Sequence, residues 1–303
     1  MIDFIGDIHG HADKLKQLLE KMGYTLKNGS YSHLHRKAVF VGDYIDRGPK
    51  IPETLEIVKN MVDHGQATAL MGNHEYNALC FHTQKATGGH LRPHLIKNII
   101  QHYETLKQFQ NRQEEYESYM EWFMTLPLFL ERDTYRAVHA CWNRENIEYL
   151  KGTLVDGRLT KELLRKSVQK GTPLNEAIDQ TLKGKEVTMP HDLHFHDKDG
   201  TKRNKIRIKW WENPEQMTYK ALSIIPMDDL PEEPILEEEQ QSNSFYDANE
   251  RPVFFGHYWF RGKPSLYREN ICCLDYSVAK RGKLVAFRFN GEEKLQIGSL
   301  KFV

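Results

Sequence analysis

The stretch Ile2-Asp3-Phe4-Ile5-Gly6-Asp7-Ile8-His9-Gly10 opens the chain with an apolar run that ends in a short polar motif. Two similar units follow. The run 37–41 leads into Gly42-Asp43-Tyr44-Ile45-Asp46-Arg47-Gly48, and the run 67–71 leads into Gly72-Asn73-His74-Glu75. Between these units, apolar residues recur at helical spacing near 11–23 and 55–62. The first 75 residues therefore predict a βαβαβ unit, for which a parallel sheet is the default.

Polar residues also end three later stretches that we expect to be strands. His139 follows 132–138, His257 follows 252–255 and Gly256, and Asp275 ends 270–275. A polar side chain at the carboxyl end of a buried strand points into the crevice where open α/β sheets bind ligands. Because the motifs extend from residue 6 to residue 275, we expect residues 1–303 to form a single domain that brings these distant segments together.

Composition narrows the class of protein. The 42 basic residues balance 42 acidic residues, so no global positive field recruits nucleic acid or anionic lipid. No apolar run is long enough to span a membrane, and residues 2–5 are needed as a strand rather than as part of a signal peptide. The four cysteines lack CxxC spacing, which predicts free thiols in a reducing cytoplasm. We expect a cytoplasmic protein with no membrane partner, and nucleic acid is not the favoured partner.

The rest of the chain predicts further elements. We expect a helix over 116–126, a strand over 132–138, helices over 145–185 interrupted at Gly171-Thr172-Pro173, and strands over 252–255, 270–275 and 284–289. The segment 191–211 alternates around Asp199-Gly200 and predicts a β-hairpin. The acidic, proline-bearing stretch 227–241 predicts an exposed loop.

The motif residues are suited to a binuclear metal centre, since Asp, His and Asn are ligands for divalent metals. Asp7 and His9 are two residues apart and can face the same way, and Asp43 can offer one oxygen to each of two ions. The expected partition gives the first ion Asp7, His9 and Asp43, and the second ion Asp43, Asn73, His139 and His257. Two such ions about 3.5–4 Å apart can polarise a phosphoryl oxygen and generate hydroxide near neutral pH.

The remaining motif residues are candidates for catalysis. His74 follows Asn73 and could protonate the leaving oxygen, while Asp46 could hold the His74 imidazole in its working tautomer. Arg47 presents a planar fork to two phosphate oxygens. Arg47 and Asn73 are therefore also candidate substrate contacts, in a reaction whose transition state is stabilised by cations.

The set GDIHG, GDYIDRG, GNHE, VHA and GH resembles the calcineurin-like metallophosphoesterases. It looks most like the phosphoprotein-phosphatase branch, which includes Ser/Thr phosphatases and diadenosine tetraphosphate hydrolases. The resemblance continues at Trp210–Pro214 and at Leu274-Asp275. It implies an α/β fold with a central β-sandwich flanked by helices, residues 145–250 as a helical and hairpin insertion or cap, and two divalent ions. Manganese is the expected metal, with Fe, Zn, Ni or Mg as alternatives.

Some positions depart from the family pattern. The family's His-Gly-Gly is replaced by His139-Ala140-Cys141, and its second phosphate-gripping arginine has only Arg251 as a candidate between Trp211 and His257. The resemblance gives Asp275 a role in supporting the ligand histidines, although it could simply cap a turn. Phosphodiesterases that share this resemblance usually read GNHD at the third motif and Gly-His-x-His at the last one. This chain reads GNHE and Gly256-His257-Tyr258-Trp259 instead, so the resemblance favours a monoester or anhydride hydrolase over a phosphodiesterase.

The leading hypothesis is a di-metal phosphatase that hydrolyses phosphate monoesters of proteins or small molecules by attack of a metal-bound hydroxide. No motif cysteine or serine is placed as a nucleophile. A nucleoside polyphosphate hydrolase is the alternative, and a non-catalytic phosphate-binding scaffold is a remote one. Specificity is expected to come from 76–135, from 145–250 and from the loop after His257. Within the insertion, Lys205, Arg207 and Lys209 share one strand face, which could meet a polyanion but is more simply a solvated hairpin edge.

Overall fold

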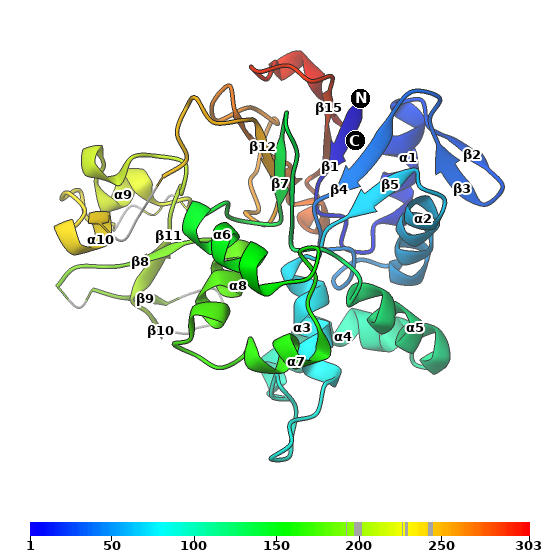
Figure 1. Cartoon of the computed structure of the whole chain (residues 1–303), viewed down its shortest axis with the longest axis horizontal. Helices are drawn as coiled ribbons and strands as arrows, with labels where there is room; N and C mark the ends of the chain where they lie inside the picture. The colour runs from blue at the N-terminus through cyan, green and yellow to red at the C-terminus, as the bar shows by residue number, and fades with distance from the viewer. Residues whose placement is uncertain (192, 197–201, 226, 228–229, 242–244) are drawn as a thin grey trace.

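The computed structural model describes residues 1–191, 193–196, 202–225, 227, 230–241 and 245–303 (Figure 1). Its first sheet has the strand order β14-β15-β1-β4-β5, with β16 beside β15. These strands are β1 (Ile2–Ile5), β4 (Lys37–Phe40), β5 (Ala67–Ala69), β14 (Asp275–Tyr276), β15 (Lys283–Phe289) and β16 (Leu300–Phe302). Strands β1, β4 and β5 run parallel, and α1 (Ala12–Lys21) and α2 (Ile51–Asp63) connect them. The predicted βαβαβ unit is confirmed.

A second sheet has the order β13-β12-β7-β6. Its strands are β6 (Phe129–Glu131), β7 (Arg136–Val138), β12 (Val253–Phe255) and β13 (Ile271–Cys273). The predicted strand 132–138 is wrong in its first half, because residues 132–135 form the turn of the β6–β7 hairpin. In that turn the Arg132 N–H donates to the Tyr135 carbonyl at 2.9 Å, and Asp133 is a residue type that favours turns.

The two sheets pack face to face as a β-sandwich. The Phe4 and Phe254 rings stack between them with centroids 3.7 Å apart, and Phe287 of β15 joins the same buried cluster. Since neighbouring residues on a strand point to opposite faces, Ile5 instead lies in the cluster beneath α1 and α2. The expected α/β fold with a central sandwich is therefore confirmed.

Helices surround the sandwich. They are α3 (Asn73–His82), α4 (Ile96–Gln108), α5 (Gln113–Phe123), α6 (Arg144–Thr153), α7 (Lys161–Lys166) and α8 (Pro173–Lys183). The predicted break at Gly171-Thr172-Pro173 is confirmed, because the Thr172 side chain caps α8 by accepting from the Asn175 N–H and Pro173 occupies the first helical position. The helical segment predicted over 145–185 thus consists of three helices.

The predicted hairpin is present as two antiparallel pairs, β8 (Glu186–Thr188) with β11 (Lys205–Arg207) and β9 (Phe195–His196) with β10 (Lys202–Arg203). Its expected turn at Asp199-Gly200 lies outside the described residues. The stretch 227–241 is not simply an exposed loop, because Leu230 and Ile235 are buried against the hairpin and residues Glu237–Gln241 form α10. Leu230 and Ile235 form a small separate core with apolar residues of the hairpin and with Tyr219 and Leu222 of α9 (Tyr219–Leu222).

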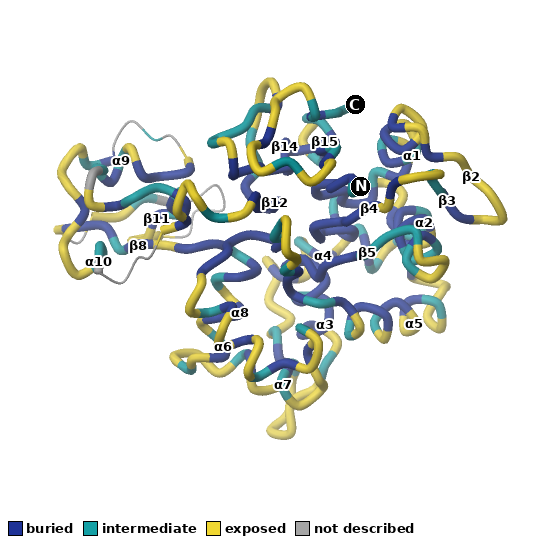
Figure 2. Tube along the Cα trace, turned by 45° about the horizontal axis from the view of Figure 1, so that its top comes forward, coloured by how far each residue is buried: buried dark blue, intermediate teal, exposed yellow. Residues whose placement is uncertain are grey.

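Figures 1 and 2 place the hairpins of the insertion at one end of the molecule, opposite the small hairpin of β2 (Thr25–Lys27) and β3 (Ser30–Ser32). Three short 3-10 helices, Pro214–Gln216, Val278–Lys280 and Ile297–Ser299, complete the structure. All four cysteines are free, as predicted, and the structure buries each of them. Among the described residues, no helix combines the length and apolarity needed to cross a bilayer.

Candidate metal centre

Loops that follow strands of both sheets converge on two groups of buried side chains. One group is His9, Asp43 and His74, and the other is Asp43, His139 and His257. Within each group the potential ligand atoms lie within 4.8 Å of one another. Residues more than 240 positions apart in sequence thus meet at one place, and Asp43 belongs to both groups.

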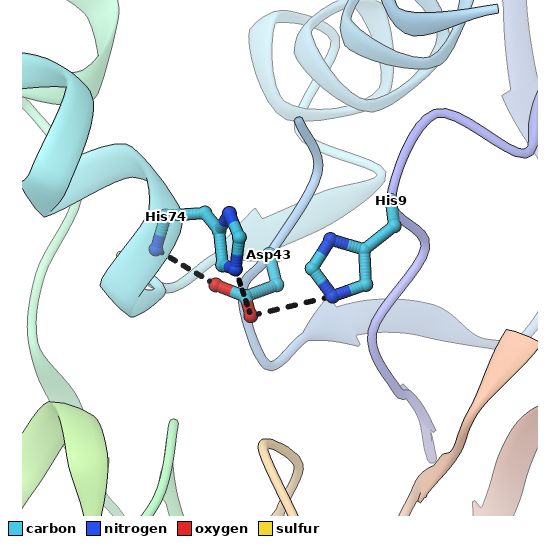
Figure 3. A group of neighbouring side chains, drawn as sticks. All are labelled: His9, Asp43 and His74. Atoms are coloured by element: carbon cyan, nitrogen blue, oxygen red, sulfur yellow. Dashed lines mark hydrogen bonds and ion pairs between the residues drawn. The ribbon is translucent and has the colours of Figure 1, made fainter. Parts of the chain in front are cut away.

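The two carboxylate oxygens of Asp43 face different groups. Oδ2 lies 3.5 Å from Nε2 of His9 and 3.9 Å from Nε2 of His74. Oδ1 lies 3.4 Å from Nε2 of His139. Figure 3 shows His9 and His74 on either side of the Asp43 carboxylate. This geometry suits a carboxylate shared between two cations.

Carbonyl groups fix the tautomers of two of these histidines. Nδ1 of His9 donates to the Ile45 carbonyl at 2.9 Å, and Nδ1 of His139 donates to the Val41 carbonyl at 2.8 Å. A carbonyl only accepts hydrogen bonds, so each neutral ring turns the lone pair of Nε2 toward the oxygens of Asp43. Lone pairs directed at a carboxylate repel it unless a cation lies between them, which is the arrangement that metal-binding histidines adopt.

Asn73 and Asp7 complete the convergence. Asn73 Oδ1 lies 3.1 Å from Nε2 of His139 and 2.8 Å from Nδ1 of His257. Asp7 Oδ2 accepts the His257 backbone N–H at 3.0 Å, whereas Asp7 Oδ1 and His257 Nε2 are buried without a hydrogen-bond partner among the described residues. A Cβ at position 256 would lie 1.9 Å from Asp7 Oδ1, so Gly256 is required there. These donor atoms fit divalent metals.

Burial sets the electrostatics of the two carboxyl groups. Burial raises the pKa of Asp7 well above its usual range, and the charges of Asp275 and Asp43 add to that shift. Burial also acts to raise the pKa of Asp43, but the imidazoles of His139, His74 and His9 outweigh it and hold the Asp43 pKa well below its usual range. A bound cation would favour the ionised form of both groups.

His74 is held by a hydrogen-bonded network. Its Nδ1 bonds to Asp46 Oδ2, while Asp46 Oδ1 accepts from His102 Nδ1 at 2.7 Å and from Thr105 Oγ1 at 2.5 Å. Although burial acts to raise the pKa of Asp46, the charges and hydrogen bonds of His74 and His102 keep that pKa well below its usual range. His102 and Thr105 were not among the predicted site residues. Their spacing of three residues on α4, which gives one polar helix face, was the available signal.

Arg47 lies at the edge of the centre. Its Nη1 is 3.0 Å from Nε2 of His9, and its guanidinium carbon is 3.6 Å from the centroid of the Trp259 ring. This stacking fixes the direction of the guanidinium fork. Trp259 was not among the predicted residues, although it follows the last histidine motif by only two positions.

Asp275 binds backbone rather than an imidazole. Its Oδ2 accepts the Trp259 N–H at 2.7 Å, and its Oδ1 accepts the Ser277 N–H at 2.9 Å. These bonds match the turn-capping alternative and not direct support of the ligand histidines. Asp275 thereby fixes the loop that carries Trp259.

The structure does not bring Arg251 to the centre. Its Nη1 donates to the Arg132 carbonyl at 2.8 Å and lies 3.6 Å from the Glu131 carboxylate. Arg251 precedes β12 whereas His257 follows it, so the strand separates the two side chains.

Arg207, on the hairpin strand β11, acts electrostatically on His257. Burial lowers the pKa of His257 well below its usual range, and the positive charge of Arg207 is the next largest cause. The Nε of Arg207 is buried with no hydrogen-bond partner among the described residues. Arg207 is partly solvated, with 29% of its side chain exposed, and its Nη2 lies 3.6 Å from the Glu186 carboxylate across the β8–β11 pair.

The motif loops have unusual backbone conformations. Five of the predicted site residues have positive φ angles, namely His9 (46°), Asp43 (56°), Asp46 (66°), Arg47 (69°) and His257 (75°). Such angles are costly away from glycine and cluster at functional sites. The buried Glu75 carboxylate holds the second motif in place by accepting the N–H groups of Asp43 at 2.9 Å and Tyr44 at 2.8 Å.

Comparisons with known proteins agree with this geometry. The sequence model of the calcineurin-like phosphoesterases matches residues 1–257. Over 74 residues the chain is 46% identical to the bis(5'-nucleosyl)-tetraphosphatase PrpE [asymmetrical] of Oceanobacillus iheyensis, which covers 24% of this chain and 30% of that protein. The PrpE of Bacillus subtilis is 44% identical over 73 residues, with the same coverage. The chain thus spans less than a third of the length of these curated relatives.

A solved structure shares the fold. The cold-active protein-tyrosine phosphatase of a psychrophilic Shewanella species superimposes with a TM-score of 0.50 at 19% identity, covering 97% of this chain and 80% of that one. At this level of identity the likeness concerns the fold alone.

Proposed function

The chain belongs to the calcineurin-like phosphoesterase family, and on that premise we propose that it is a hydrolase of phosphate monoesters that depends on two divalent cations. The observation that carries the proposal is the position of Asp43, whose two oxygens face separate groups of buried histidines. A surface cluster of acids would not show this pairing of a buried carboxylate with imidazole lone pairs.

The proposed ligands are those that the sequence motifs predict. Asp7, His9 and Asp43 would hold one ion, and Asp43, Asn73, His139 and His257 would hold the other. Manganese is the proposed metal, with Fe, Zn, Ni or Mg as alternatives. Bound there, two divalent cations supply positive charge that polarises a phosphoryl group and increases the acidity of water.

The chain's own residues would handle the proton and the phosphate. Nδ1 of His74 is engaged by Asp46, so Nε2 faces the centre and can deliver a proton to the leaving oxygen. The low pKa of Asp46 keeps this carboxylate ionised and the His74 ring oriented. Arg47, stacked on Trp259, would bind phosphate oxygens with its planar fork.

We propose that residues 145–250 act as a specificity insertion on this single domain. A Cβ at position 184 would lie 2.5 Å from the Tyr258 hydroxyl, so the end of α8 packs tightly against the loop after His257. Arg207 of the hairpin acts electrostatically on His257. The insertion therefore borders the centre, where it could contact the part of the substrate that leaves.

A nucleoside polyphosphate hydrolase is the second candidate function. Its support is the local identity to two bacterial bis(5'-nucleosyl)-tetraphosphatases. Such a substrate would use the same ligands, acid and arginine, and differ in what the bordering loops recognise.

Hydrolysis of p-nitrophenyl phosphate with manganese tests the proposal. Asp43→Asn should reduce turnover to background, and His74→Ala should lower kcat by about 100- to 10,000-fold. Asp63→Asn, which alters an exposed carboxylate on α2, is the matched control and should retain wild-type turnover. Equal turnover in all four proteins would overturn the assignment.

A further inference from the structure

A basic cavity opens beside the turn between β14 and β15. Its volume is about 430 Å³, and its lining includes Arg261, Tyr276, Ser277, Lys280, Arg281 and Lys283. Four of these side chains are cationic, and no acidic residue lines the cavity. Because the whole chain has a formal net charge of zero, this concentration of positive charge is a local feature.

Two of the cations have no counter-charge among the residues that the structure describes. The guanidinium groups of Arg261 and Arg281 are exposed and make no hydrogen bond or ion pair with another described residue. Lys283 Nζ donates only to a backbone carbonyl, that of Gly262, at 2.9 Å. An anionic ligand would therefore not have to displace a carboxylate of any described residue from these three side chains.

The backbone around the cavity is well ordered by hydrogen bonds. The N–H groups of Lys280 and Gly282 donate to the Ser277 carbonyl at 2.8 and 3.0 Å. Ser277 is in turn fixed by Asp275, the same carboxylate that binds the Trp259 N–H. One buried side chain thus fixes both the wall of the cavity and Trp259.

Trp259 connects the cavity to the metal centre. Lys280 Nζ lies 4.2 Å from the centroid of its ring, and the Arg47 guanidinium lies 3.6 Å from the same ring. Arg47 also contacts His9, whose ring centroid is 5.7 Å from that of Trp259. A line of cations therefore runs from the proposed phosphate contact, Arg47, past one indole ring into the cavity.

We propose that this cavity is a second phosphate-binding subsite, which takes the additional phosphoryl groups of a substrate whose reacting phosphoryl group lies at the metal centre. The inference rests on the proposed metal-dependent hydrolase and concerns the second candidate function, in which the substrate carries a chain of phosphoryl groups. A substrate with one phosphoryl group would be served by Arg47 and the metals alone, whereas four further cations match the charge of a phosphate chain. The ligand class is a chain of phosphoryl groups, either free or attached to a nucleoside.

Inhibition of p-nitrophenyl phosphate hydrolysis tests the subsite, at a buffered free manganese concentration. We expect tripolyphosphate to inhibit the wild type more tightly than orthophosphate does. The double variant Arg261→Ala/Arg281→Ala should bind tripolyphosphate about 10-fold or more weakly, because each replaced guanidinium removes a charge-assisted contact. Its inhibition by orthophosphate and its kcat/KM for p-nitrophenyl phosphate should not change. Arg165→Ala, which removes an exposed cation on α7, is the control and should behave as the wild type.

Adenosine triphosphate and a phosphoserine peptide separate the sources of the ligand. If the double variant loses affinity equally for adenosine triphosphate and for tripolyphosphate, the subsite recognises the phosphate chain alone. If it loses more affinity for adenosine triphosphate, the subsite contacts the nucleoside as well. Weakened binding of the phosphopeptide with unchanged binding of tripolyphosphate would overturn the proposal in favour of a protein substrate.

Calorimetry with metal-free protein separates this inference from the proposed function. If the wild type does not hydrolyse p-nitrophenyl phosphate but binds tripolyphosphate more tightly than the double variant, the function fails and the subsite stands. If hydrolysis proceeds but both proteins bind tripolyphosphate equally, the subsite is wrong and the function stands.

Discussion

The first 82 residues and the insertion 145–250 use polar side chains in opposite ways. In the first region, carboxylates and imidazoles are buried on strained loops at the ends of parallel strands. In the insertion, a small apolar core supports short hairpins, and most charged side chains face solvent. The proposed chemistry therefore depends on the most constrained backbone, whereas the insertion borders the ligands through Arg207 and Gly184 and supplies none of the assigned ligands.

The largest expected effect concerns a ligand from outside the first region. His257→Ala should lower the metal content from two ions to one and reduce turnover to background, because this residue is assigned to the second ion only. Elemental analysis of the purified variant checks the result. Unchanged metal content would show that the first 82 residues and His139 hold both ions without His257.

Asp46→Asn tests the constraint within the first region. In Asp46 one carboxylate oxygen accepts from His74 and the other accepts from His102. An asparagine amide has only one accepting oxygen, so it cannot bind both rings in this way and the His74 ring loses its fixed orientation. We expect kcat for p-nitrophenyl phosphate to fall by about 100-fold or more with little change in metal content. A variant with normal kcat would mean that His74 needs no such support.

The same variant predicts a change in acid stability. Asp46 is held ionised in the fold, with a pKa below that of the unfolded chain. Its contribution is therefore complete above about pH 4, the unfolded value, and is lost as the pH falls below it. Urea unfolding of metal-free protein should show that Asp46→Asn loses less stability than the wild type between pH 5 and pH 3. Parallel curves would contradict the assigned ionisation state.

The smallest expected effect lies in the insertion. Arg207→Ala should raise KM by about 10-fold with little change in kcat, since Arg207 borders His257 without belonging to either ligand group. Arg251→Ala removes the same charge at the far end of β12 and should leave both constants unchanged. Equal effects of the two substitutions would show that only general charge matters and would remove the distinction between the regions.

Much of the first region could be predicted because its site residues directly follow strands. The positions of Asp7, His9 and Asp43 depend on local sequence and on parallel strand pairing, both of which leave a periodic signal. His102 and Trp259 reach the site only through packing of α4 and of the turn after β12. The spacing of His102 and Thr105 indicates a polar face on α4, but it does not indicate that this face contacts Asp46.

The candidate second arginine, Arg251, lies away from the centre for a related reason. It precedes β12 and contacts Arg132 and Glu131, whereas the charge of Arg207 in the hairpin acts on His257. The composition of 227–241 likewise indicates an exposed loop, but Leu230 and Ile235 are buried against apolar residues of the hairpin. Because this core is made by segments distant in sequence, the composition of 227–241 alone does not reveal it.

Anomalous diffraction from crystals grown with manganese tests the shared role of Asp43 most directly. Two peaks are expected, one beside the Asp43 oxygen that faces His9 and one beside the oxygen that faces His139, with Asn73 and His257 around the second. A single peak, or two peaks that do not share Asp43, would contradict the binuclear centre.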